Sequence, residues 1–328
     1  MTQNSELVFD VKSCDPTTTP LILLRGGTSG EREISLASGA GVEKALIEEG
    51  FPVTTLDPAD PEFFTQMVDA RNAGAKAVFI CLHGKGGEDG TMQGLCELLG
   101  LPYTGPGVLA SALAMDKARA KVHYLDAGLK TPRSINIVRG DDWYVEDIVA
   151  VVGNKCVVKP ATEGSAIGVY IAHDPAEIAP AVEAVLAIDT QVVIETYIAG
   201  TEITAAVLGN ENPKALPVVE IVPKNEFYDF ESKYAEGGAQ HIIPARISDE
   251  ITARVQADAI KAHKALGCTC VSRTDMIIDE DGTPWLLETN TIPGMTSTSL
   301  LPDAASKVGL SYGALCHLLI DFAIEAKA

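Results

Sequence analysis

Two oxygen-bearing side chains stand close together near the end of the chain, in the stretch WLLETNTIPGMTSTSL that begins at Trp285. Glu288 and Asn290 are two residues apart, so on a β-strand both would project from the same face. The apolar run before this stretch ends in Asp281-Gly282, a dipeptide that favours a two-residue hairpin turn. A hairpin with that turn places Asp275 directly opposite Glu288.

Such a pair of opposed carboxylates predicts a cation site. Directly opposed strand residues lie roughly 4.5–5.5 Å apart, and like charges at that distance repel. A cation between Asp275 and Glu288 removes the repulsion, and magnesium is typically held by one or two carboxylates together with substrate phosphates. The alternative is a solvated hairpin with scattered acids, which the apolar runs beside these acids make less favoured.

Lysines and a glycine-rich loop in the middle of the chain could meet a phosphate ligand. The strand-like KCVVKP (155–160) carries Lys159 near its end, and ATEGSAIGVY follows as a loop and a second strand. A flexible hairpin loop of this kind can fold over phosphates and exclude water on closing. Lys117 and Lys159 would add cationic partners. An ordinary surface hairpin is the alternative, which the loop taken alone favours.

Two further polar loops follow buried strands near the N-terminus. Strand-like residues 21–24 lead into RGGTSGEREISL, and strand-like residues 77–82 lead into HGKGGEDG, which begins at His83. The first loop lacks the G-x-G-x-x-G spacing of dinucleotide-binding proteins, and the chain has no P-loop pattern. Loops at the carboxyl ends of such strands predict a ligand edge on an open parallel sheet. For His83 taken alone, a histidine that only caps its loop is an equally good interpretation.

Composition limits the class of protein. The chain has 328 residues, 46% of them hydrophobic, in alternating strand-like and helix-like runs, which indicates an α/β protein of two or three domains. The formal net charge of −20 argues against a nucleic-acid partner or an anionic membrane, since both need basic patches. No apolar run approaches the about 18 residues of a membrane-spanning helix. Seven mostly single cysteines and the lack of a signal peptide predict a cytoplasmic protein with buried thiols.

The elements that would position these groups follow from hydrophobic periodicity. Residues 1–19 are polar and predict a loosely held extension. The segment 224–240 is aromatic and charged without a clean period, which predicts a long functional loop or lid. The expected helices cover 31–49, 108–126, 141–152, 250–266 and 312–327. The expected strands cover 21–24, 77–82, 130–138 and 155–160. A further strand is expected from residue 191, with Glu195 at its exit, and the next strand begins at Glu202.

Together these segments resemble the ATP-grasp ligases, and within them the D-alanine–D-alanine ligase family. The resemblance runs from about Leu21 to the C-terminus, and seven segments in order at natural spacing make it specific. They are GGTSGEREISL (26–36), LHGKGGEDGTMQG (82–94), LPYTGPG with SALAMDK (101–117), VVKPATEGSAIGV (157–169), FYDFESKYA (227–235), RTD (273–275) and LLETNTIPGMTSTSL (286–300).

The resemblance implies an α/β protein with the ATP-grasp fold. An N-terminal open parallel-sheet domain would precede a small central α+β domain and a C-terminal α+β domain. The expected division is a polar extension at 1–19, a substrate-binding domain at 20–115, a central subdomain at 116–195 and a C-terminal subdomain at 196–328 that carries the metal and catalytic sites.

The implied reaction is the ATP-dependent joining of two D-alanines to D-alanyl-D-alanine for peptidoglycan precursors, through a D-alanyl acyl phosphate. Two magnesium ions, with manganese as a substitute, would bridge phosphates and neutralise developing charge. The implied partners are D-alanine, ATP and a second copy of the chain in a homodimer, with no nucleic acid and no membrane.

The resemblance also implies roles for particular residues. The metal ligands would be Asp275, Glu288 and Asn290. The nucleotide would be held by Lys117, Lys159 and Lys233 at its phosphates and by Glu195 and Glu202 at adenine and ribose. For the first D-alanine, Glu31 would hold the ammonium group and His83 would lie near the carboxylate. Ser299 and the Leu300 amide would bind the carboxylate of the second D-alanine, and Arg273 and the Gly294 amide would form the oxyanion site. Ser165 and Tyr234 would link Glu31 to the lid.

A few residues differ from the family's common pattern or bear on its choice of substrate. Thr196 stands where relatives often have a lysine or a large residue, and Ala166 replaces a frequent serine, which affects nucleotide affinity more than the reaction. Tyr234 favours amide formation, because family members that make the D-lactate ester carry phenylalanine there. Two alternatives stay open: a ligase with another acceptor, such as D-serine or D-lactate, and a catalytically silent nucleotide-binding module.

Overall fold

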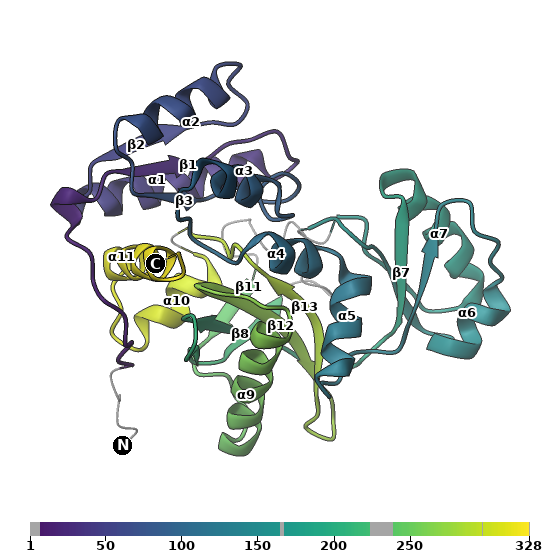
Figure 1. Ribbon diagram of the computed structural model, residues 1–328. Coiled ribbons are helices and arrows are strands. Elements are labelled where there is room, and N and C mark those ends of the chain that lie inside the picture. The colour runs from purple at the N-terminus through teal and green to yellow at the C-terminus, as the bar shows by residue number, and fades with distance from the viewer. Residues whose placement is uncertain (1–6, 165–166, 224–238, 297, 328) are drawn as a thin grey trace.

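The computed structural model describes residues 7–164, 167–223, 239–296 and 298–327. Three β-sheets organise this part of the chain, and they follow one another in the sequence. Figure 1 shows the first sheet at the upper left, the second at the right and the third below and between them. A parallel sheet followed by two antiparallel α+β units confirms the predicted fold class.

The first sheet is parallel, with strand order β2-β1-β3. Every residue of β1 and β3 is buried, because helices cover both faces of this sheet. One face, with Leu21 and Leu23, packs on α1 and α11, and the other, with Ile22 and Leu24, packs on α2 and α3. The elements are β1 (Leu21–Leu24), α1 (Arg32–Glu48), β2 (Val53–Leu56), α2 (Phe63–Asn72), β3 (Ala77–Ile80) and α3 (Thr91–Leu99).

The helix predicted over 108–126 is two helices, so that prediction was wrong. Helix α4 (Val108–Met115) ends at Asp116, and α5 (Lys117–Asp126) begins directly after it. Asp116 has an extended backbone, and its side chain accepts a hydrogen bond from the Arg119 amide at 3.1 Å. Aspartate is a strong N-cap residue, which explains why a new helix starts within an apparently continuous pattern.

The second sheet is antiparallel, with strand order β4-β7-β5-β6. Strand β5 pairs with β6 across the Gly-rich segment, which confirms the predicted strand-loop-strand arrangement. The expected strand at 130–138 and the expected helix at 141–152 each start about four residues late. The elements are β4 (Ser134–Val138), α6 (Val145–Val152), β5 (Cys156–Pro160), β6 (Tyr170–Ala172), α7 (Pro175–Ile188) and β7 (Gln191–Thr196).

The third sheet is antiparallel, with order β11-β10-β8-β12-β13 and β9 beside β8. One face packs on α5 and α9, and the other packs on α10 and α11. Helix α4 belongs to the same core as α5 and this sheet. The predicted domain boundaries at residues 115/116 and 195/196 stay a prediction. The elements are β8 (Thr201–Leu208), β9 (Lys214–Ala215), β10 (Val219–Pro223), β11 (Ala239–Ile242), α9 (Asp249–Ala265), β12 (Val271–Ile278), β13 (Pro284–Asn290), α10 (Leu300–Ser306) and α11 (Tyr312–Glu325).

The β12–β13 hairpin reaches the predicted register by an unexpected route. Ile278 pairs with Pro284, so the turn holds five residues and the predicted two-residue loop was wrong. That change alone would shift the pairing by one residue. A β-bulge then leaves Leu287 as an extra residue between two paired positions, which shifts the pairing back. Asp275 therefore lies opposite Glu288, as predicted.

The N-terminal extension is held against the fold, so the prediction of a loosely held segment was wrong for residues 7–19. Leu7, Phe9 and Val11 are half-buried and alternate with exposed residues. The Phe9 ring meets Phe322 edge-on with 5.7 Å between centroids. The missed signal was the apolar residues at positions 7, 9 and 11, although Val8 between the first two is also apolar.

No helix among the described residues is long and apolar enough to cross a membrane. All seven cysteines are free, and six of them are buried.

Candidate active site

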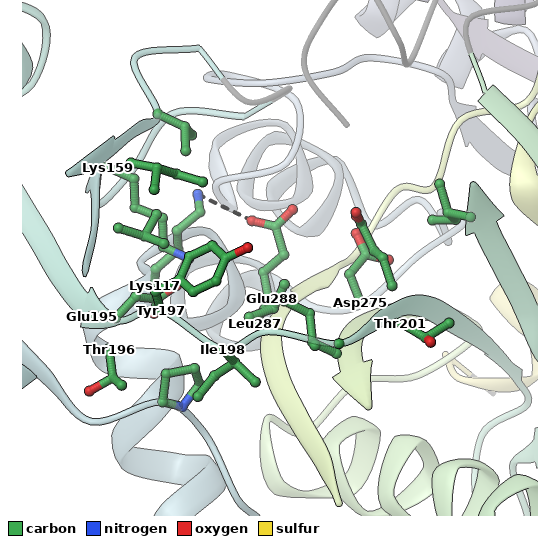
Figure 2. A pocket seen from close by; sticks show the side chains of 18 of the residues that line it. Lys117, Lys159, Glu195, Thr196, Tyr197, Ile198, Thr201, Asp275, Leu287 and Glu288 are labelled. Carbon is green, nitrogen blue, oxygen red and sulfur yellow. Dashed lines mark hydrogen bonds and ion pairs between the residues drawn. The ribbon is translucent and has the colours of Figure 1, made fainter. Parts of the chain in front are cut away.

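A cavity of ≈ 440 Å³ lies between the second and third sheets (Figure 2). Its volume falls within the range of small-ligand and cofactor sites. Its apolar lining comes from both sheets and from the segment that joins β7 to β8. The lining includes Val157, Ile171, Ile198, Ile277 and Leu287, together with the predicted site residues Lys117, Lys159, Glu195, Glu202, Asp275 and Glu288.

The predicted metal ligands meet on the β12–β13 hairpin. The Asn290 side-chain amide donates to Asp275 Oδ2 at 3.1 Å, and Glu288 lies opposite Asp275. Arg273 donates to both oxygens of Asp275, at 2.9 and 2.8 Å, and the Thr204 hydroxyl donates to Oδ1 at 2.6 Å. Figure 2 shows Asp275 and Glu288 projecting into the cavity from their strands. Three hard oxygen donors within one hairpin suit a divalent cation.

Lys117 lies between this hairpin and the Gly-rich segment. Its Nζ donates to the Glu163 carbonyl at 2.6 Å and lies 3.5 Å from Glu288 Oε2, a pair marked in Figure 2. Its own amide donates to the Ala161 carbonyl at 3.0 Å. As the first residue of α5, Lys117 is placed by the Asp116 cap that separates α4 from α5.

In the cavity wall, Glu195 accepts hydrogen bonds from two lysines. Lys159 Nζ lies 2.5 Å from Oε1, and Lys121 Nζ lies 2.7 Å from Oε2. All three side chains are at least nine-tenths buried. Burial raises the pKa of Glu195, but Lys159 and Lys121 more than offset this and hold it below its ordinary value. Burial lowers the pKa of Lys121, and Lys159 lowers it further, although Glu195 opposes this.

Sequence reasoning missed Lys121. It lies four residues after Lys117, so both lysines share one face of α5. That spacing was the available signal. The partner that makes Lys121 part of the site is 74 residues away, in β7.

The second group of predicted residues surrounds the ligand edge of the first sheet. His83 and Glu31 are 7% and 6% exposed, and the Gly84 amide donates to Glu88 Oε2 at 2.7 Å. Burial first, and the Glu31 carboxylate second, raise the pKa of Glu88 to about 8. Burial and the nearby Arg273 cation lower the pKa of His83 to about 4, so its ring is neutral at pH 7. Arg273 thus connects this group to the β12–β13 hairpin.

Glycines allow the Gly-rich segment to approach Glu31. A Cβ on Gly84 would lie 2.8 Å from Glu31 Oε2, and one on Gly164 would lie 3.0 Å from the same atom. A side chain at either position would therefore displace the carboxylate. Because Gly164 precedes β6 and Glu31 precedes α1, segments from the first and second sheets meet at this point.

The segment after β13 completes the site. A Cβ on Gly294 would lie 2.9 Å from Ser299 Oγ, and that oxygen accepts the Thr296 amide at 3.0 Å. Ser299 is the N-cap residue of α10 and Leu300 its first residue. The backbone of Ile292, at the start of this segment, partly offsets the lowering of the His83 pKa.

Three predicted site residues, Ser165, Lys233 and Tyr234, lie outside the described residues. The others fall into two groups that Arg273 joins, one at the cavity and one at the edge of the first sheet. The cavity has apolar walls, lysines and a carboxylate hairpin, which suits a nucleotide with its phosphates and a cation. Two antiparallel α+β units around such a cavity define an ATP-grasp protein.

Comparisons with known proteins agree with this class and narrow it. The family model described as "D-ala D-ala ligase C-terminus" matches residues 126–321, and the one described as "D-ala D-ala ligase N-terminus" matches residues 55–106. The D-alanine–D-alanine ligase of Halalkalibacterium halodurans is 46% identical over 93% of this chain and 99% of its own. That of Desulfotalea psychrophila is 45% identical over 93% and 95%. The chain belongs to the D-alanine–D-alanine ligase family.

Solved structures show the same likeness. The D-alanine–D-alanine ligase of Bacillus anthracis, solved in complex with ATP, has a TM-score of 0.82 at 30% identity, over 94% of this chain and 98% of its own. VanG, the D-Ala:D-Ser ligase of Enterococcus faecalis, has a TM-score of 0.81 at 31% identity, over 93% and 99%. The solved structures that share this fold are therefore named for two different acceptors, D-alanine and D-serine.

Proposed function

We propose that this protein joins two D-alanines to form D-alanyl-D-alanine at the expense of ATP, for the synthesis of peptidoglycan precursors. The observation that carries the proposal is one continuous set of contacts across both groups of site residues. Lys117 contacts Glu288, Glu288 pairs with Asp275, and Asp275 holds Arg273, which acts on His83 electrostatically. A nucleotide and an amino acid bound at the two ends would therefore lie next to each other.

The reaction has two steps that these residues can support. The carboxylate of the first D-alanine attacks the γ-phosphorus of ATP, forms an acyl phosphate and releases ADP. The amine of the second D-alanine then attacks the acyl carbon, a proton leaves the nitrogen, and phosphate departs. Lys117 and Lys159 would hold phosphates and Glu202 the ribose, with Lys233 as a further phosphate partner from outside the described residues.

Glu195 is proposed to meet adenine, and its contacts add a second role. Both of its carboxylate oxygens already accept lysine hydrogen bonds. Glu195 would thereby fix Lys159 in the cavity wall, and one edge of the Glu195 side chain would face the base. The apolar side chains of Ile198 and Leu287 would pack against the base.

Magnesium fits the donor set of the hairpin, and Asp275, Glu288 and Asn290 would hold it. When bound, it would neutralise charge on the transferring phosphate, and manganese would substitute for it.

Glu288→Gln keeps the shape of the side chain but weakens a proposed metal ligand. Turnover should therefore fall about 100-fold or more, at or above the loss that is typical when an outer-shell partner of a metal ligand is removed. The control is Glu280→Gln in the exposed turn of the same hairpin, which should keep normal turnover. Equal magnesium dependence in both variants would remove Glu288 from the metal site.

The first D-alanine is proposed to bind between Glu31 and His83. Glu31 would accept its ammonium, and the protonated Glu88 nearby spares the site a second negative charge. Neutral His83 would lie near the substrate carboxylate. Arg273 and the Gly294 amide would stabilise the oxyanion of the tetrahedral intermediate, where loss of one donor typically costs about 10²–10³ in rate. Ser299 and the Leu300 amide would hold the second carboxylate.

The choice of the second substrate is proposed to depend on residues outside the described part of the chain. Tyr234 favours D-alanine over D-lactate, and Ser165 and Tyr234 would link Glu31 to the lid. The alternative is a ligase that uses D-serine, a specificity named for the structurally similar VanG.

Phosphate release tests the proposal directly. The purified protein with Mg-ATP is given D-alanine, L-alanine, D-serine or D-lactate, and the products are identified by mass. Release with D-alanine alone, together with D-alanyl-D-alanine, is the expected outcome. A mixed product with D-serine would replace the proposed acceptor and keep the reaction. No release with any substrate, despite ATP binding, would overturn the proposed reaction.

Family resemblance also leads us to propose a homodimer that works in the cytoplasm, where ATP is available. Light scattering at working concentration is expected to give twice the mass of one chain.

A further inference from the structure

A second group of possible metal ligands lies far from the cavity, where the N-terminal extension meets the last helix. Cys14 comes from the extension, and His317 and Asp321 come from α11. One donor atom from each residue lies within 4.8 Å of the other two. Among the residues that the structure describes, no other group of three such side chains comes this close.

The distances within this group match a tetrahedral site. Cys14 Sγ lies 3.7 Å from His317 Nε2, and the same nitrogen lies 3.6 Å from Asp321 Oδ1. Ligand bonds of zinc length at tetrahedral angles place sulfur and nitrogen about 3.6 Å apart and nitrogen and oxygen about 3.4 Å apart. The two pairs that include His317 Nε2 are therefore within a few tenths of an ångström, roughly, of the distances in a shared site, and Cys14 Sγ lies within 4.8 Å of the Asp321 carboxylate.

The surroundings of His317 also suit a metal ligand. His317 and Asp321 are four residues apart on α11, the spacing at which two ligands on one helix face bind a single zinc ion. The other ring nitrogen, Nδ1, lies 3.9 Å from Glu49 Oε2. A carboxylate behind a histidine ligand is the usual means of fixing the ring and its tautomer. The Phe51 ring meets the imidazole edge-on at 5.0 Å and limits its rotation.

We propose that Cys14, His317 and Asp321 form a binding site for one zinc-like divalent ion, which fastens the N-terminal extension to α11. A thiolate, an imidazole and a carboxylate favour zinc or cobalt over magnesium. The thiolate and carboxylate would balance the two charges of the ion. The Cys14 carbonyl and the Ser13 hydroxyl, each 3.2 Å from His317 Nε2, or a water molecule could occupy the fourth position.

Metal binding at this site must release a proton. An ordinary cysteine thiol keeps its proton at neutral pH, so the free site holds the thiol form. Binding transfers the thiol proton to solvent as the metal–sulfur bond forms. The imidazole Nε2–H, which faces the Cys14 carbonyl in the free site, is replaced by the metal, and the ring proton moves to Nδ1 beside Glu49. Affinity should therefore rise with pH.

This site would be independent of the proposed ligase reaction. Glu49 follows the last residue of α1, whereas Glu31 precedes its first. The 17 residues of α1 separate the two by about 25 Å at 1.5 Å per residue. Binding can thus be measured without ATP or D-alanine, and failure of either proposal leaves the other standing.

Cobalt reports on the site because a cobalt–thiolate bond absorbs in the near ultraviolet. We expect one equivalent of Co²⁺ to give this band in the nucleotide-free protein, and Zn²⁺ to displace it. Cys14→Ser should abolish the band, while Cys156→Ser, in the remote second sheet, should keep it. Glu49→Gln should keep it with an affinity about 10–100-fold weaker, the usual effect of losing an outer-shell partner.

Thermal unfolding supplies a second readout. Zn²⁺ should raise the unfolding temperature of the wild-type protein and of Cys156→Ser but not of Cys14→Ser, each compared with its own metal-free sample. A band that survives in Cys14→Ser, no band with either metal, or binding only at millimolar concentration would overturn the proposal.

Discussion

Lys121 has no contact with the cavity, but it determines how Glu195 holds Lys159. In Lys121→Met, Glu195 keeps only Lys159 as a cationic partner, which should draw that amine away from phosphate. We expect KM for ATP to rise about tenfold or more, which corresponds to about 1.4 kcal/mol, while KM for D-alanine stays the same. Lys121→Arg should restore part of the affinity. Steady-state kinetics checks this, with exposed Lys44→Met as the control; parallel rises in both KM values would indicate general damage instead.

Glu88 makes stability depend on pH. Its pKa rises from 4.5 to about 8 in the folded protein, so between these values the folded state holds a proton that the unfolded state has lost. The stabilising contribution is therefore complete below about pH 4.5 and is lost as the pH rises through about 8. Glu88→Gln should flatten the fall of the unfolding temperature between pH 5 and pH 8.5, roughly the window set by these two values. An unchanged slope in a scanning fluorimetry series would show that Glu88 is ionised.

At this scale the sequence allowed the proposed ligands Asp275, Glu288 and Asn290 to be placed together from their local spacing. The predicted register was right although the predicted turn was wrong, because the bulge at Leu287 compensates for the wider turn. Lys121 could not be found in the same way, because its partner Glu195 lies in another sheet and no local pattern shows which lysine of a helix is buried.

Asp116 sets where α5 begins and so where Lys117 lies. Asp116→Ala removes the side-chain cap, which should destabilise the protein by about 0.5–2 kcal/mol and raise KM for ATP. Asp174→Ala is a matched control, because Asp174 caps α7 by accepting the Ala176 amide at 2.9 Å. That variant should lose similar stability and keep its KM. Kinetics and thermal unfolding of both variants check this. Equal KM values for ATP in the two variants would mean that the Asp116 cap does not position the site.

Elements were predictable where one periodic pattern was decisive. The hydrophobic pattern predicted most of the strands and helices, whereas the two α+β units were predicted from the family resemblance. The break at Asp116 lies within an apparently continuous helical pattern. The turn at 279–283 was also misjudged, because Asp279 accepts the amides of Asp281 and Thr283 and so stabilises a wider loop. The bulge at Leu287 restored the predicted register. No local sequence pattern indicated the wider turn or the bulge.

The extension and the last helix determine how the ends of the molecule are held together. Phe9→Ala removes the ring that packs on Phe322 and should lower stability by about 1–3 kcal/mol, less than for a fully buried phenylalanine. Val8→Ala, at a neighbouring residue that is 70% exposed, is the control and should be close to neutral. Thermal unfolding midpoints check both; equal midpoints for the two variants would mean that the extension adds no stability.

Contacts between distant parts of the chain were the least predictable. Cys14 and Asp321 are 307 positions apart, and their hydrogen bond depends on where three sheets place two chain ends. Hydrophobic patterns show that a face is buried, but they do not identify the segment that covers it.

The docking of α11 on the first sheet has a consequence for the newly made chain. Leu21, Leu23 and Phe79 pack against this helix, which is translated long after them. At 5–20 residues per second, the roughly 245 residues between β3 and the end of α11 take roughly 10–50 s to synthesise. During that interval the nascent N-terminal domain presents an uncovered apolar face, which a chaperone at the ribosome could shield until the last helix emerges.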